Sequence, residues 1–76
     1  MNLKNKYKVV VASDVGAERD GIGIEIYFDG ELLLEIFRDD TKRSRQISFF
    51  KNDIALEVVE ACIEEFKKEI PWEFQD

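Results

Sequence analysis

Two apolar runs on either side of Asp29-Gly30 constrain the fold of this chain more than any other feature. Residues 22–28 (IGIEIYF) and 31–38 (ELLLEIFR) place apolar side chains at alternate positions, a period that is typical of half-buried strands. Asp-Gly between two such runs is a strong signal for a hairpin turn. The sequence therefore predicts a β-hairpin in the middle of the chain, with one apolar face that another element must cover.

The type of turn decides which side chains of this hairpin meet. A two-residue type I′ turn brings Ile24 opposite Glu35 and so places a carboxylate on the apolar face. A type I turn with a left-handed Gly30 in a G1 bulge shifts the pairing by one residue, so that only apolar side chains meet there. We therefore predict the bulged register. Its facing pairs are Tyr27 with Glu31, Ile26 with Leu32, Ile24 with Leu34 and Ile22 with Ile36.

Two further segments predict strands on either side of the hairpin. Residues 7–13 (YKVVVAS) form the first strand, and residues 45–50 (RQISFF) form the fourth, with Ile47 and Phe49 facing inward. The polar connection 13–21 is rich in Asp and Gly and is longer than a minimal hairpin loop. Short connections between these strands favour an antiparallel meander in sequence order, and the alternative places the first strand at the far edge of the sheet.

One helix is predicted after the fourth strand. Asn52 or Asp53 can cap its first turn, and Pro71 stops it at about Glu69 or Ile70. Its apolar stripe consists of Ala55, Val59, Cys62, Ile63, Phe66 and Ile70. Because the inward face of the sheet is the available partner for this stripe, the fold class is α+β. We expect one domain over residues 1–76, a four-stranded antiparallel meander sheet with the C-terminal helix packed on one face (β-β-β-β-α).

The net charge of −6 comes entirely from the helix and the tail. Residues 1–51 contain nine acidic and nine basic side chains, whereas residues 52–76 contain eight acidic and two basic ones. The solvent side of the predicted helix carries Glu57, Glu60 and Glu64, with Glu65 on its flank. This side is either an ordinary solvated surface or a docking surface for a basic protein. It would repel nucleic acid, so we expect no nucleic-acid binding.

The outward face of the predicted sheet is too apolar to be left wholly to water. Its apolar members are Tyr27, Leu33, Phe37 and Phe50. The tail residues Trp72 and Phe74 either fold back over this face or contribute to a protein interface. That interface would be with a second copy of the chain or with a different partner.

The residue inventory argues against an enzyme. The chain has no His, and its single cysteine, Cys62, lies on the buried stripe of the predicted helix. A Ser/His/Asp or Cys/His arrangement and an internal disulfide are therefore excluded, and we expect no cofactor and no metal. No apolar run approaches the roughly 18 residues that span a bilayer. The start, MNLKNKYK, lacks an apolar signal region, so we expect a cytoplasmic protein without membrane association.

The runs YKVVVASDV, IEIYFDGELLLEIF and IALEVVEACIEEFKKEI resemble small uncharacterised bacterial proteins, some of them associated with immunity genes beside polymorphic or contact-dependent toxins. The resemblance implies a cytosolic inhibitor that binds a basic toxin domain. We therefore expect a non-enzymatic protein-binding module. The resemblance transfers no binding residue. The charge pattern, the outer sheet face and the tail give the candidate binding residues, which are Glu57, Glu60, Glu64, Glu65, Tyr27, Leu33, Phe37, Phe50, Trp72 and Phe74. The alternative is a small structural homodimer that associates through the outer sheet face and the tail.

Overall fold

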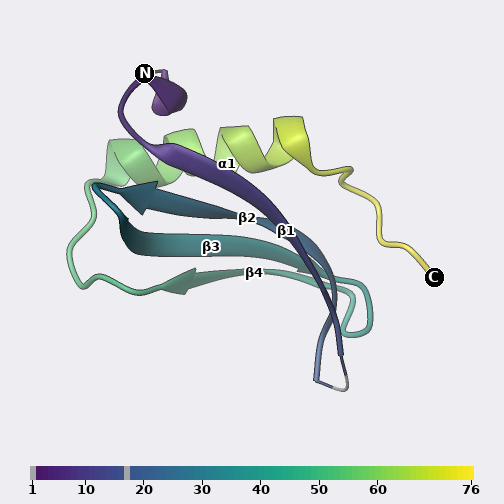
Figure 1. Ribbon diagram of the computed structural model, residues 1–76. Helices are drawn as coiled ribbons and strands as arrows, with labels where there is room; N and C mark the ends of the chain where they lie inside the picture. Colours follow the sequence, from purple (N-terminus) through teal and green to yellow (C-terminus); the bar gives the residue numbers. More distant parts are fainter. Residues whose placement is uncertain (1, 17) are drawn as a thin grey trace.

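The computed structural model describes residues 2–16 and 18–76. The elements in chain order are the 3₁₀ helix η1 (Leu3–Asn5), the strands β1 (Lys8–Val15), β2 (Asp20–Phe28), β3 (Glu31–Asp39) and β4 (Ser44–Phe49), and the helix α1 (Leu56–Glu69). The strands form one antiparallel sheet in the order β1-β2-β3-β4, and α1 lies across one face of it (Figure 1). The predicted fold class is confirmed. Within the described part of the chain, no helix has the length and apolar character that crossing a membrane requires.

The core lies between α1 and the central strands. Its buried members are Leu3, Ile24, Ile26, Leu34, Ile36, Val58, Cys62, Phe66 and Ile70. Phe66 is the largest of them and is only 2% exposed. Burying a side chain of this size contributes about 1.5–3 kcal/mol. The prediction that Phe66 and its neighbours on the helix cover the isoleucine face of the hairpin is therefore confirmed.

The turn between β2 and β3 differs from the prediction. Asp29 and Gly30 have φ angles of +52° and +81°, and Phe28 pairs with Glu31, as in a two-residue type I′ turn. The predicted type I turn with a bulge at Gly30 is wrong. Asp and Gly both tolerate the left-handed region, so Asp-Gly can form the tighter turn, whose twist matches that of the strands.

A bulge inside β3 then restores an apolar face. The register shifts after Tyr27, which pairs with Leu32, whereas Ile26 pairs with Leu34. Leu33 is the extra residue of this bulge. The observed pairs are Ile26 with Leu34, Ile24 with Ile36 and Ile22 with Arg38, so each predicted apolar pair is displaced by two residues along β3. A two-residue turn without this bulge would place Glu35 on the core face. The bulge keeps Glu35 on the outer face.

The first hairpin is longer than predicted. The pairing of β1 with β2 continues to Val15 and Asp20, and the Gly16 N–H donates to the Arg19 carbonyl at 2.9 Å. Most of the predicted 13–21 loop is therefore strand, and Ala17 lies outside the described residues. Backbone pairing can extend a hairpin into polar sequence because the ladder uses main-chain groups.

Helix α1 ends as predicted but begins later. The Ile70 N–H donates to the Phe66 carbonyl at 2.9 Å, directly before Pro71. At the other end Ala55 is the N-cap and makes no side-chain capping hydrogen bond, so neither Asn52 nor Asp53 caps the helix.

The buried side of α1 is also rotated from the predicted stripe. Val58 and Cys62 are buried, whereas Ala55 is exposed and Ile63 is 39% exposed. Helix η1, which the sequence did not suggest, packs against α1 and contributes Leu3 to the core. The additional cover on that flank explains why the helix turns the Val58 side inward.

Candidate protein-binding surfaces

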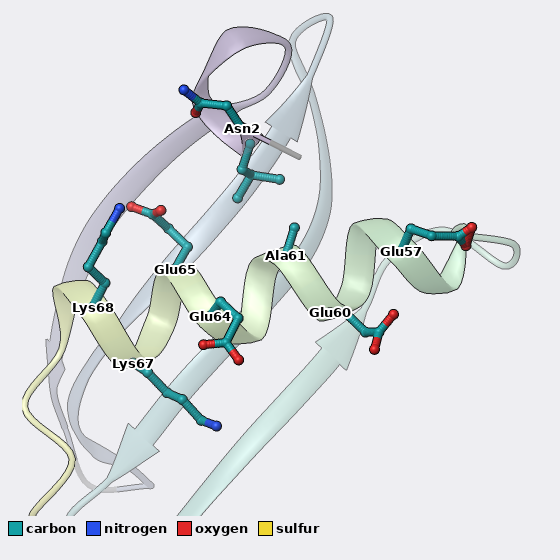
Figure 2. Close-up of a pocket in the computed structure, with 9 residues that line it drawn as sticks. Asn2, Glu57, Glu60, Ala61, Glu64, Glu65, Lys67 and Lys68 are labelled. Carbon is teal, nitrogen blue, oxygen red and sulfur yellow. The ribbon is translucent and has the colours of Figure 1, made fainter.

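An acidic ridge, defined as Glu57, Glu60 and Glu64, runs along the solvent side of α1. The spacing of three and four residues places the three side chains on one side of the helix. All three are exposed, and none forms an ion pair with a described residue. Figure 2 shows Glu60 and Glu64 extending away from the helix in the same general direction as Lys67. The predicted exposure of these three glutamates is confirmed.

Glu65 does not belong to this ridge. It is 7% exposed, and its Oε2 lies 3.3 Å from Nζ of Lys4, which also lies 3.4 Å from Oε1 of Glu69. The contact with Glu65 is an ion pair without good hydrogen-bond angles, since Glu65 Oε2 has no hydrogen bond within the described part of the chain. Pairing with Glu65, and secondarily with Glu69, raises the pKa of the Lys4 ammonium. The predicted place of Glu65 on the exposed flank is wrong because η1 covers that flank.

An open hollow of about 1010 Å³ lies between η1 and the ridge side of α1 (Figure 2). Its lining consists of Asn2, Leu3, Glu57, Glu60, Ala61, Glu64, Glu65, Lys67 and Lys68. The space is open surface, with charged groups of both signs at its border. Among residues 2–16 and 18–76, no three His, Cys, Asp or Glu side chains are placed together to hold a metal ion. The hollow therefore offers a charged contact surface for another macromolecule.

Cys62 is enclosed in the core. Its side chain is 0% exposed. Burial raises the pKa of the thiol to about 11, and the charge of Glu65 acts in the same direction. A thiol that remains protonated and inaccessible is a poor nucleophile. The described residues thus contain no constellation around Cys62 that would support covalent catalysis.

Arg19 covers part of the outer face of the sheet. Its guanidinium donates two hydrogen bonds to Glu35, at 3.0 and 2.8 Å, and one to Asp14 at 2.9 Å. The same group lies 3.8 Å from the ring centroid of Phe37, which is 2% exposed. The carboxylate of Glu35 raises the pKa of Arg19. Phe37 is therefore not free for a partner in this structure.

The other apolar residues predicted on the outer face have different surroundings. Leu33 is 6% exposed and lines a small hollow with Phe28 and Val58, on the helix side of the sheet. Tyr27 is half-buried and donates a hydrogen bond to Glu25 at 3.0 Å. Phe50 is 56% exposed. The outer face thus lacks the continuous aromatic surface that the sequence suggested.

The tail is docked, but on the helix side of the sheet. Arg45 of β4 lies 3.8 Å from the ring centroid of Trp72 and 4.2 Å from that of Phe74. Arg45 also donates to the Trp72 carbonyl, and Arg38 donates to the Pro71 carbonyl at 2.7 Å. These two arginines pair across β3 and β4 on the face that carries Ile36. Of the two predicted alternatives for the tail, the one in which Trp72 and Phe74 fold back over the outer face is therefore wrong.

The tail also holds the turn after β3. Arg38 donates two hydrogen bonds to Asp40, at 2.8 and 3.1 Å, and the Gln75 N–H donates to the same carboxylate at 3.1 Å. Arg38 holds the pKa of Asp40 below its usual range. Sequence reasoning missed this network because the tail residues lie more than thirty positions from Arg38 and Asp40.

Three apolar residues that were predicted to face inward are exposed in the structure. They are Ile47 and Phe49 on the helix side of β4 and Ile63 on α1. Their exposed fractions are 37%, 54% and 39%. Lys67 follows Ile63 by one helical turn, and its Nζ lies 6.0 Å from the ring centroid of Trp72. The same ring is stacked on Arg45 of β4. This flank of α1 therefore faces the β4 side of the domain.

Comparison of the chain with protein-family models, with curated proteins and with solved structures gives no match.

Proposed function

We propose that this protein is a non-enzymatic binding module whose acidic ridge docks onto the basic surface of another protein. The observation that carries the proposal is the local charge of α1: Glu57, Glu60 and Glu64 are exposed on one side, without an ion-pair partner in the described part of the chain. By contrast, Glu65 and Glu69 on the other flank are paired with Lys4. A row of unneutralised carboxylates attracts a basic partner at long range and raises the rate of encounter.

The proposed partner is a basic, separately encoded protein, of which a toxin domain with a cationic cleft is the type we favour. The proposed setting is the cytoplasm, where an inhibitor of this kind would neutralise its target. A rigid helix suits such a role, because the three carboxylates are held at fixed spacing before binding and lose little conformational freedom on association. Phe66 and Cys62, which lie beneath the ridge, are fully packed and keep the helix in place.

The alternative of a homodimer through the outer sheet face and tail receives less support. Phe37 is covered by Arg19, and Trp72 is stacked on Arg45 of its own chain. Phe37 and Leu33 are only 2% and 6% exposed, so neither offers apolar area to that interface.

The test uses charge reversal at equal net charge. The ridge variant carries Glu57→Lys, Glu60→Lys and Glu64→Lys. The control variant carries lysine at three other exposed acidic positions, Glu18, Asp53 and Glu73. Both variants change the net charge by the same amount, so only the location of the charge differs. Circular dichroism checks that both remain folded.

The partner is first isolated by pull-down from the native cell, and its association is then measured by stopped-flow fluorescence at low and high salt. We expect the ridge variant to associate at least about tenfold more slowly at low salt, whereas the control variant loses much less. Salt should slow the wild-type protein and leave the ridge variant nearly unchanged. Equal losses in the two variants, or an unchanged rate in the ridge variant, would contradict the proposal.

A further inference from the structure

The free edge of β4 presents a row of main-chain groups. β4 is the last strand of the sheet, and Figure 1 shows it along the border opposite β1. The Phe50 N–H donates to the Leu33 carbonyl of β3 at 2.8 Å. Hydrogen-bonding direction alternates along an antiparallel strand, so Arg45, Ile47 and Phe49 point their N–H and C=O groups away from β3. An edge of this kind is a template for another strand.

The side chains of β4 add an apolar component to this edge. Ile47 pairs with Ile36, and Phe49 pairs with Leu34, so both lie on the helix side of the sheet. They remain 37% and 54% exposed because α1 packs over β2 and β3. A strand added beside β4 would extend the sheet and bring apolar side chains of its own against Ile47 and Phe49.

The opposite edge is less suited to pairing. β1 begins at Lys8, and Lys4 and Lys6 lie just before it in the chain. Helix η1 packs against β1. Lysines and adjacent structure are the usual means by which proteins protect an edge strand. β4 itself contains one charged residue, Arg45, whose guanidinium is occupied by Trp72 and Phe74. The difference between the two edges therefore singles out β4.

We infer that a second copy of this chain pairs with β4 in antiparallel orientation, about a twofold axis at Ile47, to form a continuous eight-stranded sheet. This register is self-complementary. Ile47 meets its own copy, Arg45 lies opposite Phe49, and Gln46 lies opposite Ser48, so no charge of the strand faces a like charge. The outward groups of residues 45, 47 and 49 then exchange about six hydrogen bonds.

The charges just beyond the strand do not oppose this pairing. Arg43 and Lys51 approach each other in the same register, but each is already in an ion pair of its own chain, with Asp76 and Glu31 respectively. The interface is small, and we expect a dissociation constant on the order of micromolar. The inference concerns a surface separate from the acidic ridge, since Glu57 and Glu64 remain on the solvent side of α1.

The first experiment is sedimentation velocity over about 1–500 µM, a range chosen to span a micromolar dissociation constant. We expect the wild-type protein to change from monomer to dimer. Ile47→Lys, which places a charge on the twofold axis, should weaken association at least tenfold. The matched control is Val11→Lys on β1, because Val11 is 46% exposed and lies on the opposite edge strand. This control should dimerise like the wild-type protein.

The second experiment tests the register by trapping the paired strands covalently. The Cα atoms of a hydrogen-bonded antiparallel pair are about 5.5 Å apart, a distance that a disulfide spans. Ile47→Cys should therefore give a covalent dimer under mild oxidation, whereas Val11→Cys should not. Cys62 is buried and does not interfere. A monomer at every concentration, or dimerisation that Ile47→Lys leaves intact, would overturn the inference. A covalent dimer formed equally well by Val11→Cys would overturn the register.

Discussion

Arg19→Ala tests the cover of the outer sheet face, where a single side chain makes several contacts. The variant removes two hydrogen bonds to Glu35, one to Asp14 and the stacking on Phe37. It also leaves the Glu35 carboxylate, which is only 12% exposed, without its cation. The expected result is therefore a loss of stability that exceeds the effect of an ordinary surface ion pair.

The magnitude follows from the exposure of each contact. Hydrogen bonds to a charged group contribute about 1.5–3 kcal/mol, and an exposed cation–ring contact adds about 0.5–1 kcal/mol. Asp14 is half exposed and adds little. Because the Arg19 side chain is itself 35% exposed, solvent screening reduces the sum, and we expect a loss of about 2–3 kcal/mol. A domain of this size has a stability of about 4–11 kcal/mol.

Urea unfolding followed by tryptophan fluorescence measures this effect. A loss of this size should lower the midpoint by on the order of 1–2 M. Arg19→Lys should recover only part of it, because an ammonium cannot form the planar paired contact. A double-mutant cycle with Glu35→Gln should give a coupling energy of at least about 1 kcal/mol. A change below about 0.5 kcal/mol in Arg19→Ala would refute the reasoning, because it is the size expected for an ordinary surface residue.

Two further predictions concern the sheet and the core. Gly23→Ala should lower the free energy of unfolding by about 1–3 kcal/mol, because a Cβ at this position would lie 2.2 Å from the Ile36 carbonyl oxygen. The control Gly16→Ala should have little effect, since the nearest atom to a Cβ there is 3.8 Å away. Urea unfolding compares the two variants. Cys62 should react with a disulfide reagent at pH 8 only as fast as the domain opens, because its side chain is fully enclosed and burial also raises its pKa to about 11. Rapid labelling of the native protein would contradict this prediction. Since the pKa of the thiol is raised in the folded state, Cys62 stabilises the fold below pH 9 and loses that contribution as the pH rises toward 11.

Local patterns were sufficient to predict the four strands, the C-terminal helix and their order. The period of two in the hairpin segments, the Asp-Gly turn and the position of Pro71 are short-range signals, and each marks an element found in the structure. The exposed ridge was also predictable, because helical spacing places Glu57, Glu60 and Glu64 together. What the pattern could not predict was the exact pairing of β2 with β3. Two registers give an apolar face, and the bulge at Leu33 selects between them.

Contacts between distant residues decided the remaining features. Glu65 resembles its neighbours in sequence, but η1 covers it and Lys4 pairs with it. Arg45 and Trp72 are twenty-seven residues apart and meet only because the tail returns to β4.

The sequence by itself thus determined the strands, the helix and the location of the net charge, because these depend on periodicity and composition within short windows. Only the tertiary structure decided which flank of α1 is buried, where the tail lies and how far the apolar side chains of β4 are exposed. Those outcomes depend on how a twisted sheet and one helix share a small core, and no local pattern contains that information.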